Sequence, residues 1–145
     1  MGELLRTADL VTLHVGLTDS TRRFFGKNEF LQMKPTAQFI NTSRGELVDE
    51  GALLRALRNG RIGGAALDVV TNERSPDMNR RPIVEYARLH DNLLITPHIG
   101  GCTTESREKT ENFLATRVVA YLRKVQNERA SRIERVTLEV PESII

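Results

Sequence analysis

The 145-residue sequence has few of the features that mark particular classes of protein. It has no tryptophan and only 5% aromatic residues, and its Lys and Arg residues form no dense block. Nucleic-acid interfaces are usually strongly basic, so a net charge of only +2 argues against a nucleic-acid partner. The single cysteine, Cys102, excludes an intramolecular disulfide and a CxxC metal site. We expect no metal site, and we interpret Cys102 as a small packing residue.

Long apolar runs are also missing. No stretch of 18 apolar residues is present, so no membrane span is expected, and the first residues lack the apolar core of a signal peptide. The composition, with 39% hydrophobic and 28% charged residues, is ordinary for a soluble globular protein. These observations predict a cytoplasmic protein.

The stretch from residue 36 to residue 70 has the pattern strand, helix, strand. Its apolar run FINTS predicts a buried strand, and IGGAALDVV predicts a second one. Between them, Asp49 is placed as a helix N-cap with Glu50 in the first turn, and Asn59-Gly60 ends the helix. A unit of this length is a right-handed crossover between parallel strands.

The rest of the chain continues this alternation. Two further strands are predicted in ADLVTLHV and NLLIT, which makes four parallel strands separated by helices. A long helix over residues 103–126 is expected to bury one face, which carries Leu114, Val118, Tyr121, Leu122 and Val125. The fold class is therefore α/β with a parallel sheet in a three-layer α/β/α arrangement. We expect one domain over residues 1–126 and a charged tail over residues 127–145.

Polar residues follow the predicted strands at their carboxyl ends, where open α/β sheets bind ligands. Arg44 either binds a carboxylate through two parallel hydrogen bonds or pairs on the surface with Asp49. His98 is an acid/base candidate. Glu73 is either a solvated loop carboxylate or a partner of His98 that favours the charged imidazolium. Asp68 ends an apolar strand and needs donors, from backbone N–H groups or from a ligand amide.

The chain carries three segments that resemble, in order, signatures of the NAD-dependent D-2-hydroxyacid dehydrogenases. These segments are ADLVTLHVGLTDSTRRFF, INTSRGELVDEGALLRALRNGRIGGAALDVV and ITPHIGG. The RGELVDEGALLRAL part is especially similar to the D-3-phosphoglycerate dehydrogenases of that family. The resemblance runs from about residue 3 to residue 125. It implies a Rossmann-type dinucleotide-binding domain, NAD as cofactor and hydride transfer between NAD(H) and a small 2-hydroxy or 2-oxo acid.

The resemblance also implies a role for each matching residue. Arg44 would bind the carboxylate of the acid, and His98 would exchange a proton with its carbonyl or hydroxyl oxygen. Glu73 would hold His98 protonated and oriented, and Asp68 would accept from the nicotinamide carboxamide. The positions that would line the cofactor are Val15, Thr42, Ser43, Arg44, Asp68, His98, Ile99, Gly100 and Gly101.

The chain departs from the family pattern in three ways. Gly16 and Arg74 stand where proline is common, and no GxGxxG motif is present. The glycine-rich turn belongs to the first half of the dinucleotide fold, so only the nicotinamide half is expected here. We therefore expect a fragment that is inactive alone. The alternatives are a nucleotide-sensing interaction module like the C-terminal-binding-protein corepressors, or an inert remnant.

A homodimer is the expected assembly. The ADLVTLHV strand would normally pair with the first strand of the sheet, which this chain lacks, and its open edge would then be a template for a second chain. The helix over residues 103–126 could equally reach across to a second chain, because its apolar face needs a partner surface.

Overall fold

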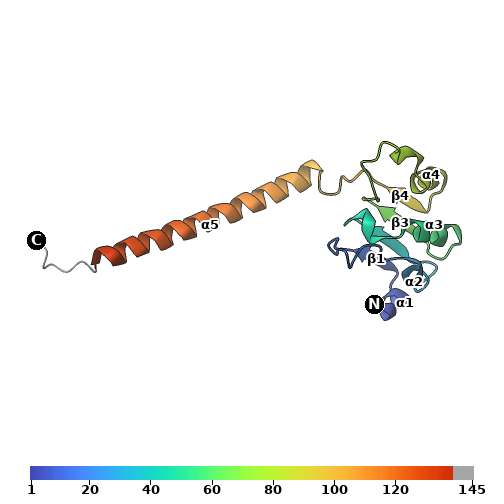
Figure 1. The fold of residues 1–145 in the computed structure, drawn as a ribbon, viewed down its shortest axis with the longest axis horizontal. Helices are drawn as coiled ribbons and strands as arrows, with labels where there is room; N and C mark the ends of the chain where they lie inside the picture. The colour runs from blue at the N-terminus through green and yellow to red at the C-terminus, as the bar shows by residue number, and fades with distance from the viewer. Residues whose placement is uncertain (139–145) are drawn as a thin grey trace, which may run out of the picture. The chain divides into compact units, whose positions relative to one another are not determined.

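The computed structural model describes residues 1–138 and divides into two units, Met1–Gly100 and the chain from Gly101 onward. The first unit contains a four-stranded, fully parallel sheet in the order β1-β2-β3-β4 (Figure 1). The strands are β1 (Leu10–Leu13), β2 (Gln38–Asn41), β3 (Gly64–Leu67) and β4 (Leu93–Ile95). The α-helices of this unit are α1 (Gly2–Thr7), α2 (Lys27–Phe30), α3 (Glu50–Arg58) and α4 (Pro82–Leu89). Two short 3-10 helices, η1 (Gly45–Leu47) and η2 (Met78–Arg80), lie in the connections.

The strand ends are aligned. Leu13 pairs with Asn41 and Asn41 with Leu67, and Leu67 in turn pairs with Ile95. The last residues of all four strands therefore lie in one row across the sheet. The loops that follow these strands emerge at the same edge, which we call the carboxyl rim.

Helix α3 begins and ends where the sequence predicts. The Asp49 carboxylate accepts a hydrogen bond from the Ala52 N–H at 3.0 Å, and this bond is the main reason why the pKa of Asp49 is lowered. Gly60 has φ +60, a left-handed conformation that favours glycine after a helix. Between them, Leu53 and Leu57 are buried. The predicted strand–helix–strand unit is confirmed.

The two faces of the sheet differ in their surroundings. Alternate side chains such as Val11, Phe39 and Leu67 are buried on one face, where Phe39 lies 5.2 Å, centroid to centroid, from Phe30 of α2. On the opposite face Leu10 and Leu94 are 54% and 61% exposed. A hollow of about 590 Å³ lies there, lined by residues of all four strands and of the loops before them.

The predicted α/β fold with a parallel sheet is confirmed, but the three-layer arrangement is not formed within Met1–Gly100. The helices of this unit pack on the Phe39 face, so the described part of the unit has one helical layer and one open sheet face. The reason is topological, because right-handed crossovers that run in one direction along a sheet place their helices on one face.

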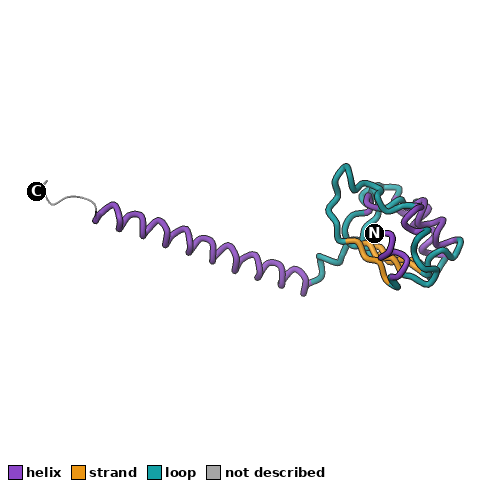
Figure 2. Tube along the Cα trace, turned by 90° about the horizontal axis from the view of Figure 1, so that it is seen from below, coloured by secondary structure: helices purple, strands orange, loops and turns teal. Residues whose placement is uncertain are grey.

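The second unit consists of one continuous helix, α5 (Thr104–Leu138) (Figure 2). Thr103 caps it by accepting from the Ser106 N–H at 3.2 Å. Nothing within the described residues of this unit covers the apolar side chains of Leu114, Val118 and Tyr121, which are 55%, 54% and 66% exposed. The expected burial of this face stays a prediction. Cys102, expected to be packed, is exposed as well.

The helix also passes the predicted boundary between a domain over residues 1–126 and a tail over residues 127–145. It continues to Leu138, and the first compact unit ends at Gly100. The predicted division into a domain and a tail stays a prediction. The last seven positions of the predicted tail, 139–145, lie outside the described residues. Among the helices of residues 1–138, none is both long enough and apolar enough to cross a membrane.

Candidate active site

The loop after β2 is held by a buried asparagine. Asn41 is 1% exposed, and its side chain donates to the Arg44 carbonyl at 2.8 Å while accepting from the Ser43 N–H at 3.0 Å. The Ser43 hydroxyl donates to the carbonyl of Leu13 in β1 at 2.8 Å. Sequence reasoning missed Asn41, although a polar residue at the end of a buried strand must find partners.

Position 45, directly after Arg44, has room only for glycine. A Cβ atom at Gly45 would lie 2.1 Å from the carbonyl carbon of Val70 and 2.3 Å from the Thr71 nitrogen. Real Cβ atoms do not approach backbone this closely, so the chain after β2 and the chain after β3 touch through the bare glycine backbone. The arginine–glycine pair thus brings Arg44 next to the loop that carries Glu73.

The guanidinium of Arg44 is open to a ligand. Its Nη1 donates to the Ser43 carbonyl at 2.6 Å, and it has no carboxylate partner among the described residues. The alternative of a surface pair with Asp49 is wrong, because Asp49 instead pairs with Arg23 at 2.7 Å. Arg44 therefore keeps donors for an anion that comes from outside the chain.

Asp68 accepts three hydrogen bonds at the end of β3. The donors are the Thr96 hydroxyl at 2.5 Å, the Ile99 N–H at 3.0 Å and the Gly100 N–H at 2.9 Å. Burial of the Asp68 carboxylate raises its pKa, but the three hydrogen bonds outweigh this effect. The pKa of Asp68 therefore lies below its ordinary value of 3.8.

The expectation that Asp68 needs donors is confirmed, and these come from the backbone and from Thr96, which sequence reasoning missed. A carboxylate has about four acceptor positions. Three are used, so one remains for the amide that the family resemblance assigns to it, and that assignment stays a prediction.

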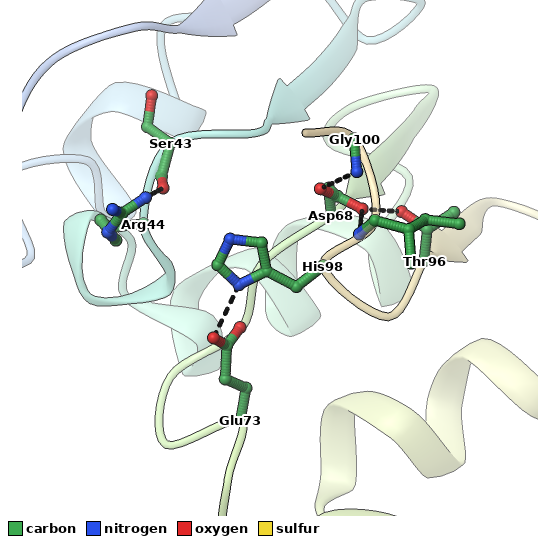
Figure 3. A network of polar contacts seen from close by, with 8 residues as sticks. Ser43, Arg44, Asp68, Glu73, Thr96, His98 and Gly100 are labelled. Atoms are coloured by element: carbon green, nitrogen blue, oxygen red, sulfur yellow. Dashed lines mark hydrogen bonds and ion pairs between the residues drawn. The ribbon is translucent and has the colours of Figure 1, made fainter. Parts of the chain in front are cut away.

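The side chains of His98 and Glu73 are hydrogen-bonded at the rim. His98 Nδ1 lies 2.7 Å from Glu73 Oε1, and the two side chains are 43% and 33% exposed (Figure 3). His98 has φ +56, a left-handed conformation that is uncommon outside glycine. The ring edge away from Glu73 faces the Ser43–Arg44 loop (Figure 3). Of the two interpretations of Glu73, the one in which it contacts His98 is therefore confirmed.

The other predicted cofactor positions suit a flat, partly apolar ring. Val15 and Ile99 belong to the loops after β1 and β4, and their apolar side chains are 42% and 46% exposed. A Cβ atom at Gly100 would lie 2.9 Å from Asp68 Oδ2, so any other residue there would displace the Asp68 carboxylate. Thr42 is exposed, and Gly101 begins the second unit. The exposed apolar side chains suit the nicotinamide ring, and the free acceptor position of Asp68 suits its carboxamide.

Comparison with known proteins decides the family. Residues 1–100 match the family model described as "D-isomer specific 2-hydroxyacid dehydrogenase, NAD binding domain". The chain belongs to this family. The recognition made from the three sequence motifs is confirmed, and so, at the level of the family, is NAD as the cofactor.

Relatives share the same part of the chain. The glyoxylate reductase of Aeropyrum pernix is 40% identical over 119 residues, which cover 82% of this chain and 34% of that enzyme. The D-3-phosphoglycerate dehydrogenase of Escherichia coli is 40% identical over 121 residues, 83% of this chain and 29% of that enzyme.

Among solved structures, the NAD-complexed D-isomer specific 2-hydroxyacid dehydrogenase of Lactobacillus delbrueckii ssp. bulgaricus aligns with a TM-score of 0.70 at 35% identity. That alignment covers 81% of this chain and 39% of the solved one. The dehydrogenase fold of this part of the chain is therefore shown. The chain spans about a third of the length of the curated relatives it matches.

The lowered pKa of Asp68 predicts a specific loss of stability in acid. An ionised carboxylate with a lowered folded-state pKa stabilises the fold above its ordinary pKa, and this contribution disappears as the pH falls through the lowered value. We expect Asp68→Asn to unfold more easily than the parent at neutral pH, by about 1–3 kcal/mol. The difference should shrink as the pH falls below 3.8. Urea unfolding from neutral pH to about pH 3 measures it.

The matched control is Asp91→Asn, since Asp91 is exposed and its side chain makes no hydrogen bond or ion pair within the described residues. Its unfolding free energy should follow that of the parent at every pH. A constant difference between the parent and Asp68→Asn across the whole range would contradict the prediction.

Proposed function

We propose that this chain is the nicotinamide-binding and catalytic half of an NAD-dependent dehydrogenase that interconverts small 2-hydroxy and 2-oxo acids. The contact between His98 Nδ1 and Glu73 Oε1 at 2.7 Å is the observation that supports it most directly. A histidine paired with a carboxylate at the carboxyl rim of a parallel sheet is a positioned acid/base group.

The residues divide the chemistry of carbonyl reduction among them. NADH, when bound, supplies the hydride. As negative charge develops on the substrate oxygen, it must be met by a proton or a positive charge. His98 donates the proton from the ring edge away from Glu73, and Glu73 stabilises the imidazolium that this donation requires. In the reverse reaction the same nitrogen takes the proton from the hydroxyl group.

Arg44 supplies the positive charge and the orientation. Its guanidinium has no carboxylate partner within the described residues, so it can hold the carboxylate that every 2-oxo acid carries. The names of the relatives include glyoxylate reductase and D-3-phosphoglycerate dehydrogenase. We propose that this chain acts on the same class of substrates, namely a small or phosphorylated 2-oxo acid.

This chain should bind NADH weakly when it is tested alone. It has no glycine-rich turn to hold the pyrophosphate, and such a turn at a helix N-terminus is a strong anion anchor. We expect a dissociation constant of about 1 mM, equivalent to roughly 4 kcal/mol of binding. An NADH titration followed by amide NMR should shift the signals of Ser43, Ile99 and Gly100, and a kinetic assay should show no turnover. Micromolar affinity would contradict this expectation.

The catalytic assignments are best tested in a chimera in which this chain replaces the matching segment of the Aeropyrum pernix glyoxylate reductase. In an active chimera, His98→Ala should lower the turnover number for glyoxylate by about 10²–10⁴-fold. Arg44→Lys loses one of two charge-assisted hydrogen bonds, which costs about 1.5–3 kcal/mol. That loss is roughly a tenfold to hundredfold drop in kcat/KM.

His14→Ala is the matched control, because His14 is exposed and, among the described residues, its side chain has a hydrogen bond only with the Thr12 hydroxyl. It should leave turnover within about twofold of the parent chimera. If His98→Ala behaved like His14→Ala while NADH still bound, His98 would not be the acid. Another group of the chimera would then have to supply the proton, and the assignment of His98 would be wrong.

We also propose a homodimer that forms through β1. Within residues 1–138, β1 pairs only with β2, so its other edge presents unpaired backbone groups beside the exposed Leu10. An open edge of this kind is a template for pairing with a second chain.

The double variant Leu10→Lys/Thr12→Lys should raise the dissociation constant of the dimer about tenfold or more in sedimentation equilibrium, because charge on an edge strand opposes pairing. Leu89→Lys, at an exposed leucine of α4, should not. A parent chain that sediments as a monomer at micromolar concentration would contradict the dimer.

A further inference from the structure

We propose that Glu50 is a positioning residue that holds Glu73 against His98. This inference rests on the proposed function, since it assigns a support to the acid/base pair. Glu50 lies in the first turn of α3 and does not itself contact His98. Sequence reasoning placed it only as an acidic residue beside the helix N-terminus.

The Glu50 carboxylate joins the two ends of the loop between β3 and α4, residues 68–81. Its Oε1 accepts from the Thr71 N–H at 2.6 Å, and its Oε2 accepts from Arg81 Nη2, also at 2.6 Å. Both side chains are largely shielded from solvent, with exposed fractions of 14% for Glu50 and 22% for Arg81. Shielded, charge-assisted hydrogen bonds are stronger than exposed ones, so this junction is a firm one.

The middle of the loop has little else to hold it. From Asn72 to Asp77, the hydrogen bonds present in the described structure connect residues of the loop with one another, apart from the bond of Glu73 to His98. Asn72 itself has φ +52, so the chain turns sharply straight after Thr71. The direction in which Glu73 leaves the body of the protein is therefore set at Thr71.

Thr71 is held from two sides. The bare backbone of Gly45 presses against Val70 and Thr71, and Glu50 fixes the Thr71 N–H. Glu73 follows two residues later and reaches Nδ1 of His98. Arg81, at the far end of the loop, binds the other oxygen of the Glu50 carboxylate and so helps to fix its orientation. The other guanidinium nitrogen of Arg81, Nη1, is buried without a hydrogen-bond partner in the described structure, so only its Nη2 serves this contact.

A spectroscopic consequence follows for His98. In a neutral imidazole, the hydrogen bond made by one ring nitrogen decides which nitrogen carries the proton. A carboxylate at Nδ1 can only accept, so it keeps the proton on Nδ1. When Glu73 moves away, the preference for Nδ1–H is lost. The ¹⁵N shifts of the His98 ring at alkaline pH report this preference directly, and a purely structural contribution of Glu50 to stability would leave them unchanged in the folded chain.

The experiment compares ring ¹⁵N spectra of the full chain and four variants. Glu73→Ala defines the His98 signal without a partner. Glu50→Ala should move the His98 shifts at least halfway from the parent values to those of Glu73→Ala, and Arg81→Met should move them in the same direction by less. Glu85→Ala removes an exposed carboxylate of α4 and should change nothing. His14, which contacts Thr12 instead of this loop, is the internal reference in every spectrum.

Two outcomes would overturn the proposal, and they separate it from the proposed function. If Glu73→Ala shifts His98 but Glu50→Ala and Arg81→Met do not, the acid/base pair stands and Glu50 does not position it. If Glu73→Ala itself leaves the His98 signals unchanged, the pair does not exist in solution, and both proposals fail. Arg81→Met lies outside α3, so it decides the question even if Glu50→Ala weakens the helix and the chain does not fold.

Discussion

The geometry of the site depends on a single buried carboxylate. Asp68 directly follows β3, and its two oxygens accept from Thr96, Ile99 and Gly100, all of which lie in the chain after β4. These bonds hold the backbone on both sides of His98, which has a left-handed conformation that would otherwise be unfavourable. Glycine at position 100 suits this junction, since a Cβ atom there would push against the carboxylate. Without this junction, the histidine would have no defined direction.

Three strand ends contribute to the site, and each uses a different device to fix its loop. The loop after β2 is bound by the amide of Asn41, the loop after β3 by its contact with Gly45 and Glu50, and the turn after β4 by Asp68. In each case a buried or shielded polar group saturates backbone donors or acceptors that the ends of the strands leave free. The exposed groups, Arg44 and the His98–Glu73 pair, then keep their outward-facing atoms available.

Local sequence patterns predicted much of the fold. Asp49 and Gly60 mark the ends of α3 through rules that depend on a few neighbouring residues, and both positions are confirmed. The strands were recognised for a similar reason, because β-branched and apolar runs between turn residues are local signals. The length of α5 and the exposure of its apolar residues were not predicted, since periodicity shows that a face is apolar but not whether anything covers it.

The residues of the site likewise fall into those that the sequence predicted and those that it did not. Arg44, Asp68, Glu73 and His98 were found because their position after predicted strands, together with the family motifs, points to them. Asn41, Thr96 and Glu50 were missed, because each acts on a segment that is reached only when the chain has folded. Glu50 lies 21 residues from its partner Thr71 and 31 from Arg81, and no spacing rule connects positions so far apart.

The compactness of the site within one unit has an evolutionary consequence. Arg44, Glu73, His98 and the residues that hold them all belong to Met1–Gly100, so no partner within this network is supplied from outside that segment. Under the proposed function, a gene segment that encodes this unit would carry the acid, its carboxylate and the residues that hold both, so that recombination at the ends of the segment would not separate them.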